Sequence, residues 1–295
     1  AFRTRYDVIH GTEEGGVIAW VVARLTGAKC IYEKHSDPAS HRKGGVKNLL
    51  LAIYRRVERF VARHTDAVIC TGPGLECQAR QYAPKTPVYR ISDIPSSLHH
   101  PDQKEIDRVR SEIETDTENM LVTYVGSFAI YQGIELLFES IPIVLNSNRR
   151  VRFVIIGGEQ SEIETHNRRV AVHGERVCFL GLIDPNRLPA YLAASDIVLA
   201  PRKSGINTPL KLLDYLKSNT AIVATDTIAN RQILDNDCAR LTQFDAKSFS
   251  SAIIDLVDDC AERCRLAKNG YARFEAEFTF EEFTRRIEHV YRSLD

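Results

Sequence analysis

Short apolar runs alternate with segments of helical spacing along almost the whole chain. Runs with the length and composition of buried strands lie at residues 7–10, 29–32, 67–71 and 88–91. Between them lie helical patterns such as residues 46–64, where apolar side chains return every three or four positions. Strands that alternate with helices in this way predict parallel sheets covered by helices, and therefore an α/β fold.

A shift in composition divides this series into two. The stretch IPSSLHHPDQ, residues 94–103, is rich in turn-forming residues, and a second series of strands begins at Met120. A chain of 295 residues is long enough for two domains with separate cores. We predict a first domain over residues 1–98, a second over residues 99–278 and a closing helical segment over residues 279–295.

The first predicted domain is short for a Rossmann-like fold, which usually needs about 120 residues or more. Either this domain is small by nature, or strands that precede Ala1 are missing. The chain begins with Ala rather than Met, and its opening residues lack the regions of a secretion signal. We therefore interpret the chain as a fragment or a processed form with an incomplete first domain.

Charge and cysteine content exclude several classes of protein. Basic and acidic residues balance at 39 each, so the chain has no positive excess typical of a nucleic-acid binder. No apolar run approaches the ~20 residues of a membrane span. The seven cysteines include no CxxC pair, so reduced thiols in a cytoplasmic protein are expected rather than disulfides or a metal site.

The most informative segment is APRKSGINTPLKLLDYL, residues 200–216. A predicted buried strand leads into a loop that ends in Asn207 and Thr208, and Pro209 follows, which together mark the start of a helix. The carboxyl ends of parallel strands are where open α/β sheets bind ligands, and the N–H groups of a helix start favour phosphate. A cation at Lys211, in the first turn, is unfavourable unless an anion binds there.

Lys211 and Asp214 lie three residues apart and project from one face of this helix. With a diphosphate bound, Lys211 would contact the phosphates and Asp214 would accept hydrogen bonds from sugar or ribose hydroxyls. The alternative is a solvent-facing ion pair without a function. Local chemistry does not decide between these two interpretations.

Two further strands of the second domain end in glycine-bearing loops, YVGSFAIYQG and IIGGE. Gly126 allows a ligand to approach the backbone, and Ser127 can donate to a phosphate. Because parallel strands end at one edge of a sheet, Gly158 and Lys211 are expected near them. The pattern is not GxGxxG, which disfavours a dinucleotide-dependent dehydrogenase.

Histidines follow or end two strands of the first domain, each beside acidic residues. His35 lies in YEKHSDP, and His10 precedes Glu13 and Glu14 in DVIHGTEEGG. A histidine in this setting can act as an acid or base or orient a substrate hydroxyl. The alternative is a packing or surface role.

The predicted helix over residues 46–64 is strongly basic. Glu58 is its single acidic residue, and its basic neighbours are Arg42, Lys43, Lys47, Arg55, Arg56, Arg59 and Arg63. We expect its apolar stripe to pack on the sheet and its charges to face water. The alternative is that the helix lies on an anionic membrane.

These segments together resemble glycosyltransferase family 4, the group 1 retaining transferases with the GT-B fold. In that fold two Rossmann-like domains face each other across a cleft. DVIHGTEEGG, YEKHSDP and ARHTDAVICTGPG resemble the latter half of the acceptor-side domain. Residues 124–145 resemble the first strand–loop–helix of the donor domain, and residues 177–226 resemble its nucleotide-sugar site. The resemblance implies that the family's N-terminal strands have no counterpart here and that residues 279–295 return to the first domain.

The resemblance also implies residue roles. Lys211 and His35 are the expected catalytic residues, with Lys211 on the donor diphosphate and His35 close to the reacting sugar. The expected donor site comprises Gly126, Ser127, Gln132, Gly158, Leu182, Asn207, Thr208, Leu210, Lys211 and Asp214. The expected acceptor side comprises His10, Glu13, Glu14 and His35.

This chain departs from the family at four donor-site positions. The first Glu of the E-x7-E motif falls on Ile206, and Asp214 replaces the second. The Arg and Lys that many relatives place on the diphosphate fall near Ser127 and on Gln132. Lys211 is therefore expected to be the main phosphate cation.

The implied activity is transfer of a sugar from a UDP- or GDP-sugar to a hydroxyl acceptor, such as a glycan or lipid-linked saccharide, with retained configuration and without a metal or other cofactor. We expect a cytoplasmic protein of polysaccharide biosynthesis, with membrane contact through residues 46–64 left open. One alternative is an impaired or non-catalytic nucleotide-sugar binder. Another is a two-domain isomerase such as a UDP-sugar 2-epimerase, which would need more acid and base groups.

Overall fold

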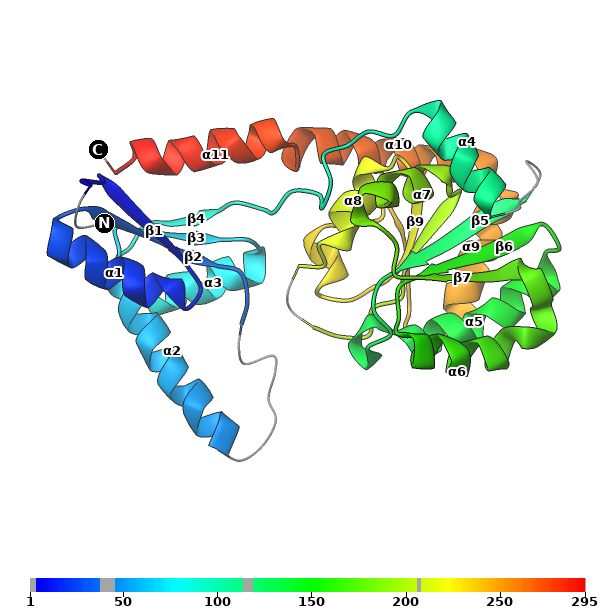
Figure 1. Cartoon of the computed structure of the whole chain (residues 1–295), viewed down its shortest axis with the longest axis horizontal. Coiled ribbons are helices and arrows are strands. Elements are labelled where there is room, and N and C mark those ends of the chain that lie inside the picture. The colour runs from blue at the N-terminus through cyan, green and yellow to red at the C-terminus, as the bar shows by residue number, and fades with distance from the viewer. Residues whose placement is uncertain (1–3, 38–45, 114–118, 206–207, 295) are drawn as a thin grey trace. The chain divides into compact units, whose positions relative to one another are not determined.

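The computed structural model describes residues 4–37, 46–113, 119–205 and 208–294, and they form two compact units (Figure 1). The first unit comprises Ala1–Asp93, Ile206–Thr208 and Phe280–Asp295, and the second comprises Ile94–Gly205 and Pro209–Thr279. Each unit has a parallel sheet with helices packed on it, so the predicted α/β class is confirmed.

The first unit is built on a four-stranded parallel sheet in the order β1-β2-β3-β4. Its strands are β1 (Val8–Thr12), β2 (Lys29–Lys34), β3 (Ala67–Cys70) and β4 (Val88–Arg90). Its helices are α1 (Gly15–Thr26), α2 (Val46–His64), α3 (Pro73–Tyr82) and α11 (Phe280–Arg292). Sequential order across the sheet places the four carboxyl ends side by side at one edge.

A buried ion pair joins the sheet of the first unit to α2. The ammonium group of Lys34 on β2 contacts the carboxylate of Glu58 on α2, and both side chains are almost fully buried. The hydroxyl of Tyr32 donates to the same carboxylate oxygen at 3.2 Å. These contacts, together with the buried Val61 and Ala62, anchor the last part of α2 on the unit.

The earlier part of α2 does not pack as the sequence analysis predicted. Leu49, Leu50 and Ile53 are 65%, 61% and 51% exposed, and Val57 and Phe60 are also exposed. The reason is a mismatch of lengths. A helix of 19 residues is about 28 Å long, whereas the four residues of β3 span about 13 Å. The prediction that the whole stripe packs on the sheet was therefore wrong.

The second unit contains a six-stranded parallel sheet in the order β10-β9-β8-β5-β6-β7. Its strands are β5 (Met120–Val125), β6 (Val151–Ile156), β7 (Val177–Gly181), β8 (Ile197–Ala200), β9 (Ala221–Thr225) and β10 (Arg240–Thr242). Its α-helices are α4 (Gln103–Glu112), α5 (Ile134–Ser147), α6 (Gln160–Val170), α7 (Leu188–Ala194), α8 (Lys211–Lys217), α9 (Ala246–Asp258) and α10 (Cys260–Glu277).

The strand order of the second unit reverses once. From β5 the chain builds outward through β6 to β7, and it then returns to place β8 on the other side of β5. The carboxyl ends of β5 and β8 therefore flank the switch point, where open α/β sheets bind their ligands.

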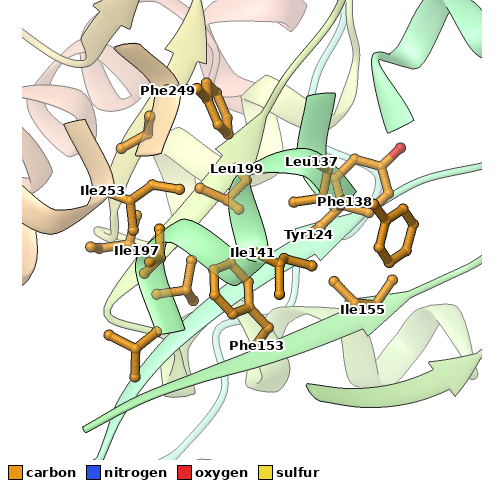
Figure 2. Packing of buried hydrophobic residues seen from close by; sticks show 14 of the residues in the cluster. Tyr124, Leu137, Phe138, Ile141, Phe153, Ile155, Ile197, Leu199, Phe249 and Ile253 are labelled. Carbon is orange, nitrogen blue, oxygen red and sulfur yellow. The ribbon is translucent and has the colours of Figure 1, made fainter. Parts of the chain in front are cut away.

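The largest of the apolar clusters in the described part of this unit fixes these strand ends in place. Figure 2 shows Leu137 and Ile141 of α5, Phe153 of β6, and Phe249 and Ile253 of α9 in this core. Each of these five side chains is fully buried. Because both helices pack on the strands that lead to the switch point, the loops that follow those strands start from rigid positions.

Candidate functional site

Glycines let two loops approach each other at the carboxyl edge of the second sheet. Gly126 follows β5 with φ 149°, and Gly157 and Gly158 follow β6 with φ 107° and 79°. A Cβ atom at Gly157 would lie 2.2 Å from the carbonyl oxygen of Gly126, and one at Gly158 would lie 2.7 Å from the ring of Phe128. Side chains at these positions would close the space between the loops.

A cavity of about 560 Å³ lies beside these loops. Four of the predicted donor-site residues line it, namely Gly126, Ser127, Gly158 and Leu182. Its other walls are largely apolar, formed by Phe128, Ala129, Val125, Ile156, Ile183, Pro185 and Leu188. An apolar cavity of this size with a few polar groups at one end is suited to a nucleotide-sized ligand.

The start of α6 also borders this cavity, and its backbone N–H groups are capped by carboxylates of the same helix start. The side chain of Glu162 accepts a hydrogen bond from the backbone N–H of Glu159 at 2.9 Å, and the side chain of Glu159 accepts one from the backbone N–H of Glu162. Two acidic side chains therefore occupy the N–H groups that could otherwise bind a phosphate. A diphosphate in the cavity would have to turn toward β5 and β8 instead.

Lys211 lies at the switch point, as predicted. Its Nζ atom donates to the carbonyl oxygen of Val125 at 3.1 Å and to Oε1 of Gln132 at 3.2 Å, and it lies 4.6 Å from the ring centroid of Tyr124. A Cβ atom at Gly126 would come within 3.3 Å of Nζ. The structure thus brings Lys211, Gln132 and Gly126 together.

The surroundings of Lys211 disfavour its positive charge. Burial, with a smaller contribution from the positive charge of Arg202, lowers its pKa from 10.5 to about 7. Among the described side chains, no carboxylate lies within ion-pair distance of Lys211. A desolvated ammonium group without an acidic partner favours the binding of an anion.

Sequence reasoning overlooked Arg202, the second residue after β8. The residue is 8% exposed, its Nε donates to the carbonyl oxygen of Ser204 at 3.0 Å, and its guanidinium carbon lies 5.4 Å from the ring centroid of Tyr131. The signal was present in APRKSG, since a residue directly after a strand of the switch point faces the ligand edge.

The helix after this loop is shorter than predicted. It begins at Lys211 rather than at Pro209, it has seven residues, and the preceding Leu210 is 52% exposed and provides no side-chain cap. A helix of two turns has a weak dipole, so the lysine itself supplies the positive charge. Thr208 directly precedes Pro209, whereas Asn207, like Ile206, lies outside the described residues.

Asp214 lies away from the cavity that Gly126 and Leu182 share. Its Oδ1 atom accepts hydrogen bonds from the backbone N–H and the hydroxyl of Ser96, at 2.8 and 2.9 Å. It lines a separate cavity of about 210 Å³ with Lys217, whose Nζ donates to the carbonyl oxygen of Ser97 at 2.7 Å. Ser96 thus occupies Oδ1 of the carboxylate for which a ribose contact was predicted, and that contact stays a prediction.

A second polar cluster lies at the carboxyl edge of the sheet in the first unit. Glu33 at the end of β2 binds two imidazoles, since its carboxylate oxygens lie 3.2 Å from Nε2 of His10 and 3.2 Å from Nε2 of His35. The other ring nitrogen of His10 lies 2.9 Å from the hydroxyl of Tyr291, and that of His35 lies 3.6 Å from Asp93.

Electrostatics in this cluster favour the charged form of His35. The hydrogen bond to Glu33 raises the pKa of His35, with a smaller contribution from the charge of Asp93. Burial opposes ionisation of Glu33, but the hydrogen bonds from His10 and His35 outweigh it and hold the pKa of this carboxyl far below its usual range. Burial raises the pKa of Asp93. The cluster therefore holds the His35 imidazole between two carboxyl groups, which favours its charged form.

The remaining predicted acceptor-side residues differ in their positions. Oε1 of Glu13 accepts from the backbone N–H groups of His35 and Ser36, at 2.7 and 2.6 Å, and so fixes the loop after β2. Glu14 precedes α1, is exposed and makes no cap hydrogen bond. Glu13 therefore belongs to the cluster, whereas Glu14 does not.

Two further properties concern the whole described part of the chain. Within it, no group of three His, Cys, Asp or Glu side chains is arranged to hold a metal ion. None of its helices combines the length and apolar character that crossing a membrane requires.

Two family models match the chain. The model described as "Glycosyl transferase 4-like domain" covers residues 2–92, and the model described as "Glycosyl transferases group 1" covers residues 119–259. The two matches fall on the two units.

Curated relatives give the same family. A phosphatidyl-myo-inositol mannosyltransferase of Mycolicibacterium smegmatis is 28% identical over 146 residues, which are 48% of this chain and 37% of that protein. The lipopolysaccharide core biosynthesis glycosyltransferase LpsE of Rhizobium meliloti is 25% identical over 256 residues, which are 84% of this chain and 70% of LpsE. The chain spans only about a third of the length of the mannosyltransferases it matches, 37% and 32% in two cases.

Solved structures agree on the fold. HepE of Anabaena, crystallised with UDP, superposes with a TM-score of 0.82 at 16% identity, over 98% of this chain and 79% of HepE. WaaG, a glycosyltransferase of lipopolysaccharide biosynthesis, gives a TM-score of 0.68 at 14% identity, over 92% of this chain and 80% of WaaG. At these identities the likeness establishes the two-domain Rossmann-like fold.

Proposed function

The chain belongs to the group 1 glycosyltransferases, and from this membership we propose that it transfers a sugar from a nucleoside diphosphate sugar to a hydroxyl acceptor, with retention of the anomeric configuration. The observation that carries the proposal is the lysine at the switch point. Lys211 is a desolvated cation without an acidic partner among the described residues, and it lies beside Gly126, which lines the nucleotide-sized cavity.

In this proposal the donor base occupies the apolar end of the cavity, beside Leu182, Ile183 and Leu188. The diphosphate extends past Gly126 toward Lys211. When the bond between the sugar and the diphosphate breaks, negative charge grows on the departing phosphate, and Lys211 would stabilise it. The protein cation would take the place of a metal ion, so we propose a metal-independent reaction.

The choice of base remains between uracil and guanine. HepE has been crystallised with UDP and with UDP-glucose, so UDP-sugars are the first donors to test, and GDP-sugars are the second. On the acceptor side, His35 and His10 are the candidate residues to orient the acceptor hydroxyl, and Glu33 holds both imidazoles.

We also propose that α2 places the protein on the cytoplasmic face of an anionic membrane. Its exposed apolar residues Leu49, Leu50 and Ile53 share the helix with the exposed Arg56 and Arg59. Apolar and basic side chains together on one exposed helix are typical of helices that lie in the lipid interface. The names of two relatives refer to phosphatidyl-myo-inositol and to lipopolysaccharide, which supports a lipid-linked saccharide as acceptor.

The experiment that tests the proposal supplies UDP- and GDP-sugars together with a lipid and glycan extract and measures released nucleoside diphosphate. Donor binding is measured in parallel by titration. Release that depends on the extract supports the transferase. Binding without release favours the alternative of a non-catalytic nucleotide-sugar binder, and the absence of any nucleotide binding contradicts both.

A further inference from the structure

We propose that Arg202 is a second donor-site cation that acts on the β-phosphate, the one that leaves with the nucleotide when the sugar is transferred. The inference rests on the proposed function, because it assigns Arg202 to the binding of the same nucleotide-sugar donor. It starts from the charge around Arg202. Among the described residues, no carboxylate forms an ion pair with Arg202, and its neighbour Lys211 carries the same charge.

When two cations lie close together and are partly buried, each one disfavours the charged form of the other. Arg202 is 8% exposed, burial lowers its pKa, and its positive charge in turn lowers the pKa of Lys211. The contacts of Arg202 that we observe are to neutral groups, namely the carbonyl oxygen of Ser204 and the ring of Tyr131. An arrangement of this kind is unfavourable by itself and becomes favourable once an anion neutralises it.

The backbone of Arg202 is held rigidly. Its carbonyl oxygen accepts a hydrogen bond of 2.5 Å from the hydroxyl of Thr225, and the side-chain amide of Asn230 donates to the carbonyl oxygen of Ala200 at 3.3 Å. At Gly205 the chain has φ 119°, and a Cβ atom there would lie 2.5 Å from the guanidinium Nη2. The loop is therefore shaped around the guanidinium group, which places the charge in advance of binding.

Strand order indicates which phosphate Arg202 meets. The cavity for the base lies over the ends of β5, β6 and β7, Lys211 contacts the last residue of β5, and Arg202 follows β8 on the opposite side of β5. Neighbouring strands are about 4.8 Å apart, so a donor that extends across the sheet from β7 meets Lys211 first and Arg202 next. Arg202 is thus positioned for the phosphate farther from the base.

This assignment separates nucleoside diphosphates from monophosphates. We expect Arg202→Ala to weaken the binding of UDP about tenfold or more, because one charge-assisted contact is lost, and to leave the binding of UMP unchanged within about twofold. Arg202→Lys should retain most of the preference for UDP. The same series is run with GDP and GMP, so that the test does not depend on the base.

A charge-relocation variant tests whether charge is the cause. Gln132 lies 3.2 Å from Lys211, so Gln132→Lys in the Arg202→Ala background returns a positive charge to the same end of the site. Partial recovery of UDP binding is expected. Arg231→Ala is the matched control, because Arg231 lies in the same unit and pairs with Asp226 at the surface, and it should bind UDP as the unmodified protein does.

Each outcome bears on one claim. Equal loss of UDP and UMP binding in Arg202→Ala, or no loss of either, with an unchanged unfolding temperature, would overturn the assignment to the β-phosphate. If the unmodified chain binds none of the four nucleotides, the proposed function itself fails. If Arg202→Ala lowers the unfolding temperature, Arg202→Lys serves as the test instead. A retained preference of Arg202→Lys for UDP over UMP supports the proposal, and a lost preference contradicts it.

Discussion

The ammonium group of Lys211 donates a hydrogen bond of 3.2 Å to the side-chain oxygen of Gln132. Lys211 begins α8, which follows β8, and Gln132 lies in the segment after β5; these two strands flank the switch point. Because the amide of Gln132 is neutral, it orients the ammonium group without neutralising it. The charge of the ammonium form is therefore left for a ligand to neutralise, at the sheet edge where open α/β sheets bind ligands.

Replacing Lys211 by Met should stabilise the protein and abolish its function. The substitution keeps the length of the side chain and removes a desolvated charge that has no acidic partner among the described residues. Since one unit of pKa shift corresponds to about 1.4 kcal/mol, we expect the free energy of unfolding at pH 7 to rise by about 1 kcal/mol or more. Donor affinity should fall at least about tenfold. Thermal unfolding and nucleotide titration measure the two effects.

Lys217 on the same helix provides the matched control for this substitution. Its Nζ donates to the partly buried carbonyl oxygens of Ser97 and His99, so Lys217→Met removes both hydrogen bonds and should destabilise the protein. Nucleotide binding should not change. If Lys211→Met binds the donor normally, or if Lys217→Met abolishes donor binding, the position of the donor site is wrong.

Donor affinity should fall as the pH rises through the pKa of Lys211, which burial lowers to about 7. A bound diphosphate favours the ammonium form, so binding takes up a proton at a pH above this value. The measurement is a titration with an intact nucleotide sugar between about pH 6 and pH 9, where the diphosphate of the ligand stays fully ionised. Affinity that is independent of pH would mean that Lys211 does not contact the phosphates.

The same pKa shift predicts how stability depends on pH without a ligand. The pKa of Lys211 is lower in the folded protein than in the unfolded chain, so the unfolded state binds more protons between about pH 7 and 10.5. The contribution of Lys211 to the free energy of unfolding therefore rises with pH in this window. The stability difference between Lys211→Met and the unmodified protein should shrink from pH 7 to pH 10.

Sequence reasoning identified those features that depend on strand order and glycine position. Parallel strands end at one edge of a sheet, so the sequence alone predicts that Gly126, Gly158 and Lys211 lie near one another. The contacts of Lys211 with Gln132, and the shared cavity of Gly126, Ser127, Gly158 and Leu182, agree with that expectation. The α/β class followed from the same alternation.

Other features depend on side-chain partners far away in the sequence. The engagement of Asp214 with Ser96, 118 residues away, cannot be derived from the spacing of Lys211 and Asp214 on one helix. Strand lengths in the folded unit decide how far α2 extends beyond the sheet and where Glu58 is buried against Lys34. Arg202 was not predicted as a site residue because the recognisable sequence pattern is that of the helix start. The loop before this helix start holds the second cation.

Glu33→Gln should lower the pKa of His35. The hydrogen bond to Glu33 is the main reason why the pKa of His35 is raised, and a neutral amide would remove most of this stabilisation of the imidazolium. NMR titration of the imidazole protons measures the change, and Thr12→Val is a control that removes only a 3.3 Å hydroxyl contact to the same carboxylate. An unchanged pKa of His35 in Glu33→Gln would contradict the role of Glu33.

His35 should also make stability depend on pH in the opposite direction to Lys211. Its pKa is higher in the folded protein than in the unfolded chain, so its contribution is complete below the ordinary value of 6.5. That contribution is lost as the pH rises through the raised pKa. In Glu33→Gln the decline in the free energy of unfolding over this range should be smaller.

Replacing only one partner of the Lys34–Glu58 ion pair should destabilise the first unit strongly. Both side chains are almost fully buried, and removing one partner leaves the other charge uncompensated, which costs about 3–5 kcal/mol. We expect this loss in Glu58→Leu, and a substantial recovery in the double variant Lys34→Met/Glu58→Leu, because the buried charge is gone. Denaturant unfolding of the full chain measures both. Additive losses in the double variant would show that the two residues do not interact.

The exposed stripe of α2 should bind anionic lipid. We expect the protein to sediment with vesicles of phosphatidylglycerol and phosphatidylcholine, and less with phosphatidylcholine alone, because apolar insertion and charge attraction act together. Ile53→Asp places a carboxylate on the 51% exposed apolar stripe and should abolish sedimentation. Val172→Asp, at an 88% exposed apolar position of the second unit, is the matched control and should sediment normally. Arg56→Gln/Arg59→Gln should remove the preference for the anionic vesicles. If Ile53→Asp binds as the unmodified protein does, α2 is not the lipid-binding surface.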